Sequence, residues 1–252
     1  MLRLFIGLIP FPKLRRRLRK RYAPTFRLRP FQVERDTKCL IVAPHPDDEV
    51  IGAGGVLSKY AKNFDVIVMS SAGVAYGELT AHERSNLRLQ EFDKVMKYLG
   101  IKNHWIFETF GKPMFIDKIN GYLNDYARVL DLEKYDFIFL PYPRDNHPEH
   151  RHITLRVMKK LMRMKKVKPS VQIMFYEVWT PIEKPNLWVD ISDVIDEKKK
   201  LICMYKSQIV DGWDYDRWAN GLALYRGMYV RPNHYAEVFQ GLTLKEYLRS
   251  VK

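Results

Sequence analysis

The chain has 252 residues, of which 46% are hydrophobic and 29% charged, and its formal net charge is +14. This length and composition are enough to bury the core of one large α/β domain, and a single domain is expected. With only two cysteines, Cys39 and Cys203, the sequence excludes a disulfide framework and a cysteine-type zinc site. A reducing compartment, the cytoplasm, is therefore expected.

The first 37 residues are predicted to be a basic extension that precedes a domain at residues 38–252. Residues 13–29 are rich in Lys and Arg and contain no acidic residue. Residues 4–11 are apolar, but this run is far shorter than the roughly 20 residues of a membrane-spanning helix. The cluster of Lys and Arg residues comes after the apolar run, whereas in a signal peptide the positive charges precede it. Two interpretations stay open: residues 1–29 lie on an anionic membrane at its inner face, or they pack along the domain or a partner. No motif that reads nucleic acid follows them, so nucleic acid is not expected as a partner.

Beyond the extension, apolar runs of strand length alternate with segments of helix length. Strands are predicted at residues 38–43, 65–70, 104–108, 136–142 and 172–178. Helices are predicted at residues 49–62, 81–99, 116–131 and 148–165, with a glycine-containing loop at residues 71–80. This alternation is typical of a Rossmann-like, doubly wound and mainly parallel α/β sheet. The glycines after the first strand do not form the GxGxxG pattern, so a dinucleotide site is not expected.

Two polar segments follow predicted strands. Residues 43–55, APHPDDEVIGAGG, place a histidine, two aspartates and a glutamate directly after the first strand. Residues 144–152, RDNHPEHRH, follow the strand at residues 136–142 and hold three histidines. Ligands bind beyond the carboxyl ends of the strands in open α/β sheets, so the two segments predict one shared site. A solvated acidic turn is the alternative for the first segment, but it does not explain the second.

The residue types in these segments favour a catalytic metal. Zinc is bound by imidazole nitrogens and carboxylate oxygens, and a catalytic zinc keeps three protein ligands and an open position for water. His45 and Asp48, with one histidine of the second segment, make such a set. Asp47 then remains as a general base toward water. The pattern indicates a metal-dependent hydrolase.

The same segments resemble the signatures of the LmbE-like, or PIG-L, family of zinc-dependent N-deacetylases. In this chain APHPDDE at residues 43–49, with an extra Pro44, and HPEH at residues 147–150 correspond to the family's AHPDDE and HPDH. Weaker similarities extend the resemblance over residues 38–239; they are RxxE at 88–91, LG at 99–100, EVW at 177–179, VDIS at 189–192, SQ at 207–208 and YAEVF at 235–239.

The resemblance implies a role for each signature residue. His45, Asp48 and His150 bind Zn²⁺, or another divalent metal such as Fe²⁺, and Asp47 is the general base. His147 polarises the substrate carbonyl or protonates the leaving amine. Glu149 replaces an aspartate that is thought to orient the neighbouring histidine, so its longer side chain must reach differently.

The expected activity is removal of the acetyl group from an N-acetylglucosamine-type sugar. The basic N-terminus favours a nucleotide-linked or lipid-linked sugar in cell-surface glycan or glycolipid biosynthesis. Asp145 stands where some thiol-sugar deacetylases of the family have a tyrosine, which disfavours those substrates. Two alternatives stay open: a deacetylase or amidase for a soluble thiol-sugar conjugate or another small amide, and a non-catalytic scaffold. The oligomeric state is not predicted.

Several further residues have two interpretations. Arg88 binds substrate, or it forms a buried pair with Glu91. Glu49 is catalytic, or it stabilises the start of its helix, which is the favoured interpretation. The aromatic-rich residues 213–229 stack on a sugar, or they close a core or an interface. The other histidines, His82, His104, His152 and His234, are expected to be structural or exposed.

Overall fold

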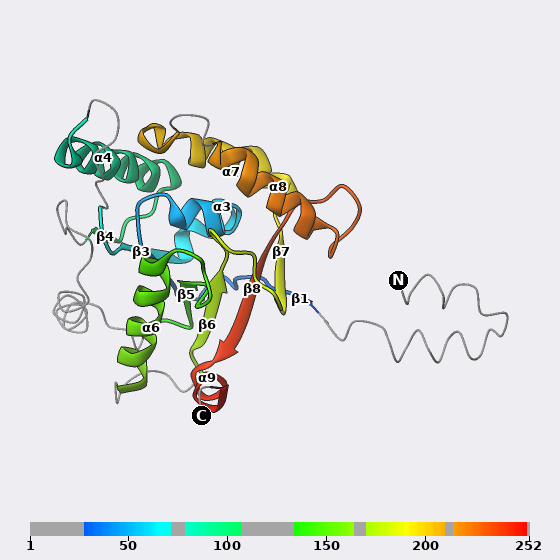
Figure 1. Cartoon of the computed structure of the whole chain (residues 1–252). Coiled ribbons are helices and arrows are strands. Elements are labelled where there is room, and N and C mark those ends of the chain that lie inside the picture. Colours follow the sequence, from blue (N-terminus) through cyan, green and yellow to red (C-terminus); the bar gives the residue numbers. More distant parts are fainter. Residues whose placement is uncertain (1–27, 72–78, 107–133, 164–169, 210–213, 251–252) are drawn as a thin grey trace, which may run out of the picture.

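The computed structural model describes residues 28–71, 79–106, 134–163, 170–209 and 214–250. Within these residues the chain forms an eight-stranded sheet in the order β1-β7-β8-β6-β5-β2-β3-β4, with helices on its faces (Figure 1). The predicted helix at residues 116–131, most of the basic extension and most of the loop at residues 71–80 lie outside the described residues.

The five predicted strands are confirmed, and neighbours among them pair in parallel. They are β2 (Cys39–Ala43), β3 (Phe64–Val68), β4 (His104–Ile106), β5 (Phe137–Pro141) and β6 (Gln172–Tyr176). Every residue of β2 is buried, because this strand is covered on both faces. The chain builds β3 and β4 on one side of β2 and then β5 and β6 on the other. The strand order therefore reverses between β2 and β5, and this is where a ligand site is expected in such a sheet.

Three further strands were not predicted: β1 (Arg29–Pro30), β7 (Leu187–Asp190) and β8 (Ala236–Thr243). Strand β8 runs antiparallel to both β6 and β7, so five of the seven pairings are parallel and the sheet is mixed. Strands β1 and β7 are too short to give a clear periodic pattern, having two and four residues. The alternation of polar and apolar residues therefore did not reveal β1 and β7.

Strand β1 falls within the predicted extension. It pairs with β7, and the Phe31 ring that follows lies 5.0 Å from the Phe137 ring. Residues of this segment therefore contact the sheet. The boundary of the extension at residue 37 stays a prediction.

The helices form a layer on each face of the sheet (Figure 1). Helices α3 (Asp48–Tyr60), α4 (Ala81–Leu99), α7 (Ile195–Cys203) and α8 (Tyr215–Gly227) bury apolar residues in one cluster, while α6 (Pro148–Arg163) and α9 (Leu244–Ser250) contribute to a second cluster. Single turns of 3₁₀-helix lie at Ala61–Asn63, Ser192–Val194 and Lys206–Gln208. Alternate side chains of β2 point into the two clusters, with Ile41 in the first and Leu40 in the second. In the part of the chain that the structure describes, no helix meets the length and hydropathy required to cross a bilayer.

Helix α4 shows how local sequence fixes an element. Thr80 and Glu83 form a capping box at its start, in which each side chain binds the other residue's backbone N–H. Gly100 ends the helix with φ 71°, a left-handed conformation that glycine adopts without steric cost. These two signals explain why the predicted bounds of this helix are confirmed to the residue.

Candidate active site

The two polar segments meet where the strand order reverses. His45 follows β2, and α3 begins three residues later at Asp48. Asp145 follows β5, and α6 begins at Pro148. Because β2 and β5 are hydrogen-bonded neighbours, the loops after them lie side by side. The expected shared site is therefore present.

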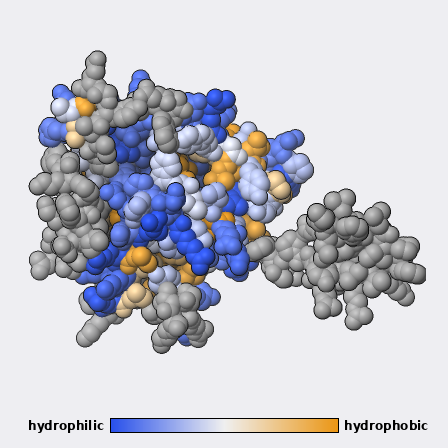
Figure 2. All heavy atoms as spheres, viewed as in Figure 1, coloured by the Kyte–Doolittle hydropathy of each residue, from blue (hydrophilic) through white to orange (hydrophobic). Residues whose placement is uncertain are grey.

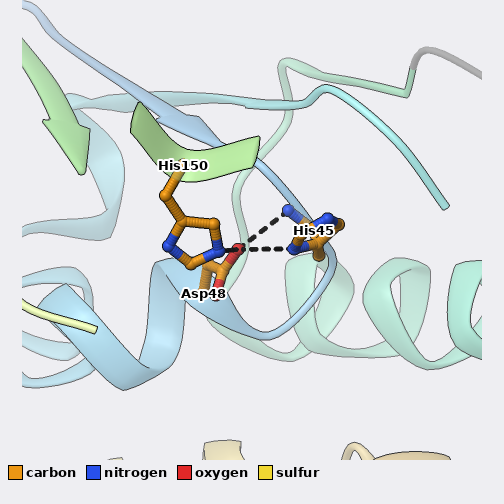
Figure 3. Close-up of side chains that lie close together, drawn as sticks. All are labelled: His45, Asp48 and His150. Carbon is orange, nitrogen blue, oxygen red and sulfur yellow. Dashed lines mark hydrogen bonds and ion pairs between the residues drawn. The ribbon is translucent and has the colours of Figure 1, made fainter. Parts of the chain in front are cut away.

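His45, Asp48 and His150 form a buried cluster that could hold a metal ion (Figure 3). Each offers one ligand atom, and these atoms lie within 4.8 Å of one another. Oδ2 of Asp48 is 3.2 Å from Nδ1 of His45 and 3.2 Å from Nε2 of His150. The three predicted ligands thus come together as two imidazoles and one carboxylate.

The polar groups of this cluster fit a cation. Both ring nitrogens of His150 are buried, and their contacts with the carboxylates of Asp48 and Asp145, at 3.2 and 3.4 Å, do not have hydrogen-bond geometry. Such nitrogens are costly unless another group binds them. Burial opposes the charge on Asp48, but His150 and His45 outweigh it and hold the pKa of this carboxyl below its usual range. Burial also lowers the pKa of His150, but Asp48 and Asp145 raise it to about 10. Without a metal, an ionised Asp48 therefore lies beside a protonated His150, and a cation bound there would take the place of the imidazolium proton.

Asp145 supports this cluster from behind, a role that the sequence analysis did not predict. Its carboxylate is fully buried, with Oδ1 3.4 Å from Nδ1 of His150 and 2.8 Å from the backbone N–H of His147. Oδ2 accepts backbone hydrogen bonds from Trp179 and Thr180 at 3.0 and 3.2 Å. A carboxylate behind a ligating histidine fixes the ring and its tautomer. Asp145 also ties the start of α6 to the loop after β6.

Glu149 contacts a different histidine from the one expected. Its Oε2 lies 2.6 Å from Nε2 of His45, whereas it was expected to orient the adjacent His147. The side chain is one methylene longer than the aspartate of the family signature, and it reaches across to the first polar segment. Glu149 therefore positions a candidate metal ligand.

Asp47 lies next to the cluster with an unusual backbone. Its φ is 117°, which is a strained value for a residue with a side chain. The carboxylate is buried, and its Oδ2 accepts a hydrogen bond of 2.8 Å from Nη2 of Arg88. Burial raises the pKa of Asp47 to about 6, and Arg88 opposes this increase. Asp47 is therefore a carboxylate that can exchange a proton near neutral pH.

Of the two interpretations of Arg88, the pair with Glu91 is wrong. Arg88 binds Asp47, and Glu91 accepts hydrogen bonds from the backbone N–H and the hydroxyl of Ser207 at 2.9 and 2.5 Å. Asp47 comes from a loop far from α4 in the chain, so spacing along the helix could not reveal it as the partner. A role of Arg88 in substrate binding stays a prediction.

His147 lies beside the cluster and is half-buried. Its ring centroid is 5.3 Å from that of His45 and 4.6 Å from that of His150. Nδ1 of His147 is buried and has no hydrogen-bond partner within the described residues. Burial and the two neighbouring histidines lower the pKa of His147, so its ring is neutral at neutral pH. A neutral imidazole can still donate one hydrogen bond to a substrate oxygen.

Glu49 contacts structural groups at the start of α3, in line with the favoured interpretation that it stabilises the start of this helix. Its Oε2 accepts a hydrogen bond of 3.0 Å from the backbone N–H of Asp47, and Oε1 accepts one from the hydroxyl of Tyr205. Burial raises the pKa of Glu49 to about 8. The remaining histidines are also structural or exposed: His82 contacts Asn86, His104 contacts Asp93, His152 is exposed, and His234 contacts Asp190.

A family model described as PIG-L, GlcNAc-PI de-N-acetylase, matches residues 40–161, a span that contains both polar segments. The chain is similar to this PIG-L, or LmbE-like, family in sequence and in fold. It is 28% identical over 223 residues to a diacetylchitobiose deacetylase of Thermococcus kodakarensis, which covers 79% of this chain and 81% of the relative.

Two further comparisons give the same similarity. Over 88 residues, 30% of this chain and 29% of the relative, the chain is 33% identical to the 1D-myo-inositol 2-acetamido-2-deoxy-alpha-D-glucopyranoside deacetylase of a Nocardioides species. The structure of N,N'-diacetylchitobiose deacetylase from Pyrococcus horikoshii superposes with a TM-score of 0.68 at 22% identity, covering 95% of this chain and 96% of that one. This last similarity establishes that the chain has the same fold as that deacetylase.

Proposed function

We propose that this chain is a metal-dependent N-deacetylase that removes the acetyl group from an N-acetylglucosamine-type sugar. The observation that carries the proposal is the arrangement of His45, Asp48 and His150 around a common point, with the buried carboxylate of Asp47 beside them. The two relatives compared in sequence are named as deacetylases of acetamido sugars, which supports the same reaction class.

His45, Asp48 and His150 would hold the metal, and two imidazoles with one carboxylate suit Zn²⁺, with Fe²⁺ as the alternative. When bound, a divalent metal polarises the acetyl carbonyl and lowers the pKa of water at the site. Asp145 and Glu149 hold two of the three ligands in place through Nδ1 of His150 and Nε2 of His45. The ligand set is therefore supported by carboxylates on both sides.

Asp47 acts as the general base in this proposal. A carboxylate with a pKa of about 6 is ionised at neutral pH and can take a proton from the attacking water. The proton then passes from Asp47 to the nitrogen of the leaving amine. Arg88 stabilises the ionised form and orients the carboxylate through Oδ2.

His147 supplies the hydrogen bond to the acetyl oxygen. Negative charge develops on this oxygen as water adds to the carbonyl carbon, and a donor placed beforehand stabilises it. Because the pKa of His147 is lowered, the donor is a neutral ring N–H and not an imidazolium. This assignment leaves Asp47 as the group that protonates the amine.

Acetate release tests the reaction class. The purified protein is incubated with N-acetylglucosamine, an N-acetylglucosamine disaccharide, a thiol-sugar conjugate and a simple acetamide, and acetate is measured. Release from the sugars and not from the simple acetamide supports the proposal. Release from the thiol-sugar conjugate alone would favour the soluble-conjugate alternative, and the absence of release from every compound would favour the scaffold.

The cellular context in the proposal is cell-surface glycan or glycolipid biosynthesis at the inner face of a membrane. The support is the basic composition of residues 1–29. Each Lys or Arg near an anionic surface contributes about 1 kcal/mol, an attraction that salt weakens. Residues 1–29 are thus proposed as a peripheral membrane contact.

Vesicle co-sedimentation tests this contact. A truncation that removes residues 1–27 keeps β1 and its pairing with β7. The intact protein should sediment with anionic vesicles, remain in solution with neutral vesicles and be released by high salt, whereas the truncated protein should stay in solution. Equal partitioning of the two proteins would remove the support for a membrane-linked substrate.

A further inference from the structure

Three aromatic side chains form a cluster near the candidate metal site: Trp179 from the loop after β6, and Tyr215 and Trp218 from the start of α8. The ring centroids are 5.9 Å apart for Trp179 and Tyr215, 6.4 Å for Trp179 and Trp218, and 5.6 Å for Tyr215 and Trp218. Trp179 is 38% exposed and Trp218 is 48% exposed, so the cluster does not close a core. It lies where α8 brings apolar side chains to the surface (Figure 2).

The aromatic cluster forms one wall of a cavity of about 240 Å³ between α3, α8 and β8. Most of the lining is apolar, but Glu177, Lys198 and Glu237 also line it. Nζ of Lys198 lies 2.6 Å from Oε1 of Glu237, and Glu177 pairs with Arg226. The cavity therefore combines aromatic walls with buried charged groups.

The cavity lies beside the reaction centre. The Trp179 ring stacks against the His147 ring, with centroids 6.4 Å apart and planes at 22°. Burial and the charge of Asp47 raise the pKa of Tyr215 to about 12, so this phenol is neutral at neutral pH. The residues of the candidate metal site do not line the cavity, and Trp179 is the lining residue that contacts His147.

We propose that this cavity is a subsite for a second pyranose ring, the one attached to the N-acetyl sugar that reacts. A pyranose has apolar C–H faces that can pack on an indole and hydroxyl edges that can donate to carboxylates, which matches the walls and the charged groups. An alkyl chain has no group that could form a hydrogen bond with the buried ion pairs. The volume is below the roughly 300–1,000 Å³ of sites for drug-sized ligands, so it suits one ring and not a longer chain. This inference rests on the proposed deacetylase function.

Binding measurements separate the subsite from the chemistry. Titration calorimetry on Asp47→Asn protein, purified with its metal, compares N-acetylglucosamine, N,N'-diacetylchitobiose and the octyl glycoside of N-acetylglucosamine. We expect the disaccharide to bind between about twofold and tenfold more tightly than the monosaccharide, as one aromatic stacking contact allows. Adding Trp218→Ala should make the affinity for the disaccharide equal to that for the monosaccharide, without lowering the affinity for the monosaccharide. Trp218→Phe should keep most of the difference in affinity.

Tyr225→Ala is the matched control, because Tyr225 lies on the same helix, is 55% exposed and does not line the cavity. It should leave the advantage of the disaccharide unchanged. Equal affinity for the two sugars, an advantage that survives Trp218→Ala, or tighter binding of the octyl glycoside than of the disaccharide would overturn the subsite. In any of these cases, acetate release by the unmodified protein would show that the proposed deacetylase function holds without the subsite. Failure to bind or deacetylate any sugar would overturn both the subsite and the deacetylase function.

Discussion

Nη2 of Arg88 donates a hydrogen bond of 2.8 Å to Oδ2 of Asp47, and both side chains are buried. The pair joins α4 to the loop after β2, and it sets the acidity of the candidate base. Burial alone would favour the protonated form of Asp47, which cannot accept a proton from water. Arg88 opposes this effect, and the resulting pKa of about 6 keeps Asp47 ionised at neutral pH.

The first prediction concerns the acid limb of the pH profile. Because Asp47 acts in its ionised form, kcat/KM should fall as the pH drops through the pKa of this group. Arg88→Gln removes the charge that lowers this pKa, so the acid limb should move to higher pH by about one unit or more. Arg88→Lys should move it less. Arg84→Gln, which removes a buried arginine one turn earlier on α4, is the control, and an equal movement in that variant would contradict the account.

The second prediction separates the roles of His147, in the loop before α6, and Glu149, in the first turn of α6. His147→Ala should lower turnover by about 10²- to 10³-fold, as loss of a donor to a developing oxyanion does, and leave the metal content unchanged. Glu149→Gln should instead weaken metal affinity by about tenfold to a hundredfold, because Glu149 contacts His45. Metal titration and initial rates measure both. Loss of metal from His147→Ala would mean that His147 and His150 must exchange roles.

The third prediction concerns Asp145. Asp145→Ala leaves three backbone N–H groups without their acceptor and removes the carboxylate behind His150. Each buried donor left unpaired costs about 1–3 kcal/mol, so the metal-free protein should unfold at a clearly lower temperature. Metal affinity should also fall by about tenfold to a hundredfold. Asn146→Ala, a change at an exposed neighbouring side chain, should alter neither quantity, and unchanged stability of Asp145→Ala would refute this role.

The sequence was most informative where the signals are local. Apolar runs located β2 to β6, and the predicted bounds of α4 coincide with its capping box and with Gly100. The residues of the candidate metal site were also evident, because each follows a strand end and carries a metal-binding side chain. These features depend on spacing within a few residues.

The contacts that shape the site were not evident, because they join distant parts of the chain. Asp47 and Arg88 are separated by 41 positions, and Asp145 and Trp179 by 34. Glu149 and His45, which are in contact, are 104 positions apart in the chain. Their contact depends on the conformation of the Glu149 side chain, which the sequence does not reveal. Strands β7 and β8 were missed for a related reason, since they are held in the sheet by pairing with each other and with β6.

The central claim is that metal binding and proton transfer belong to different residues. It is tested most directly by measuring metal content and acetate release together in Asp47→Asn and His150→Ala. Asparagine matches aspartate in size and shape, so the first change adds no steric demand at position 47, where φ is 117°. Asp47→Asn should keep the metal of the unmodified protein and lose at least about 10²-fold in turnover, and His150→Ala should lose the metal. Full activity of Asp47→Asn, or full metal content of His150→Ala, would contradict the account.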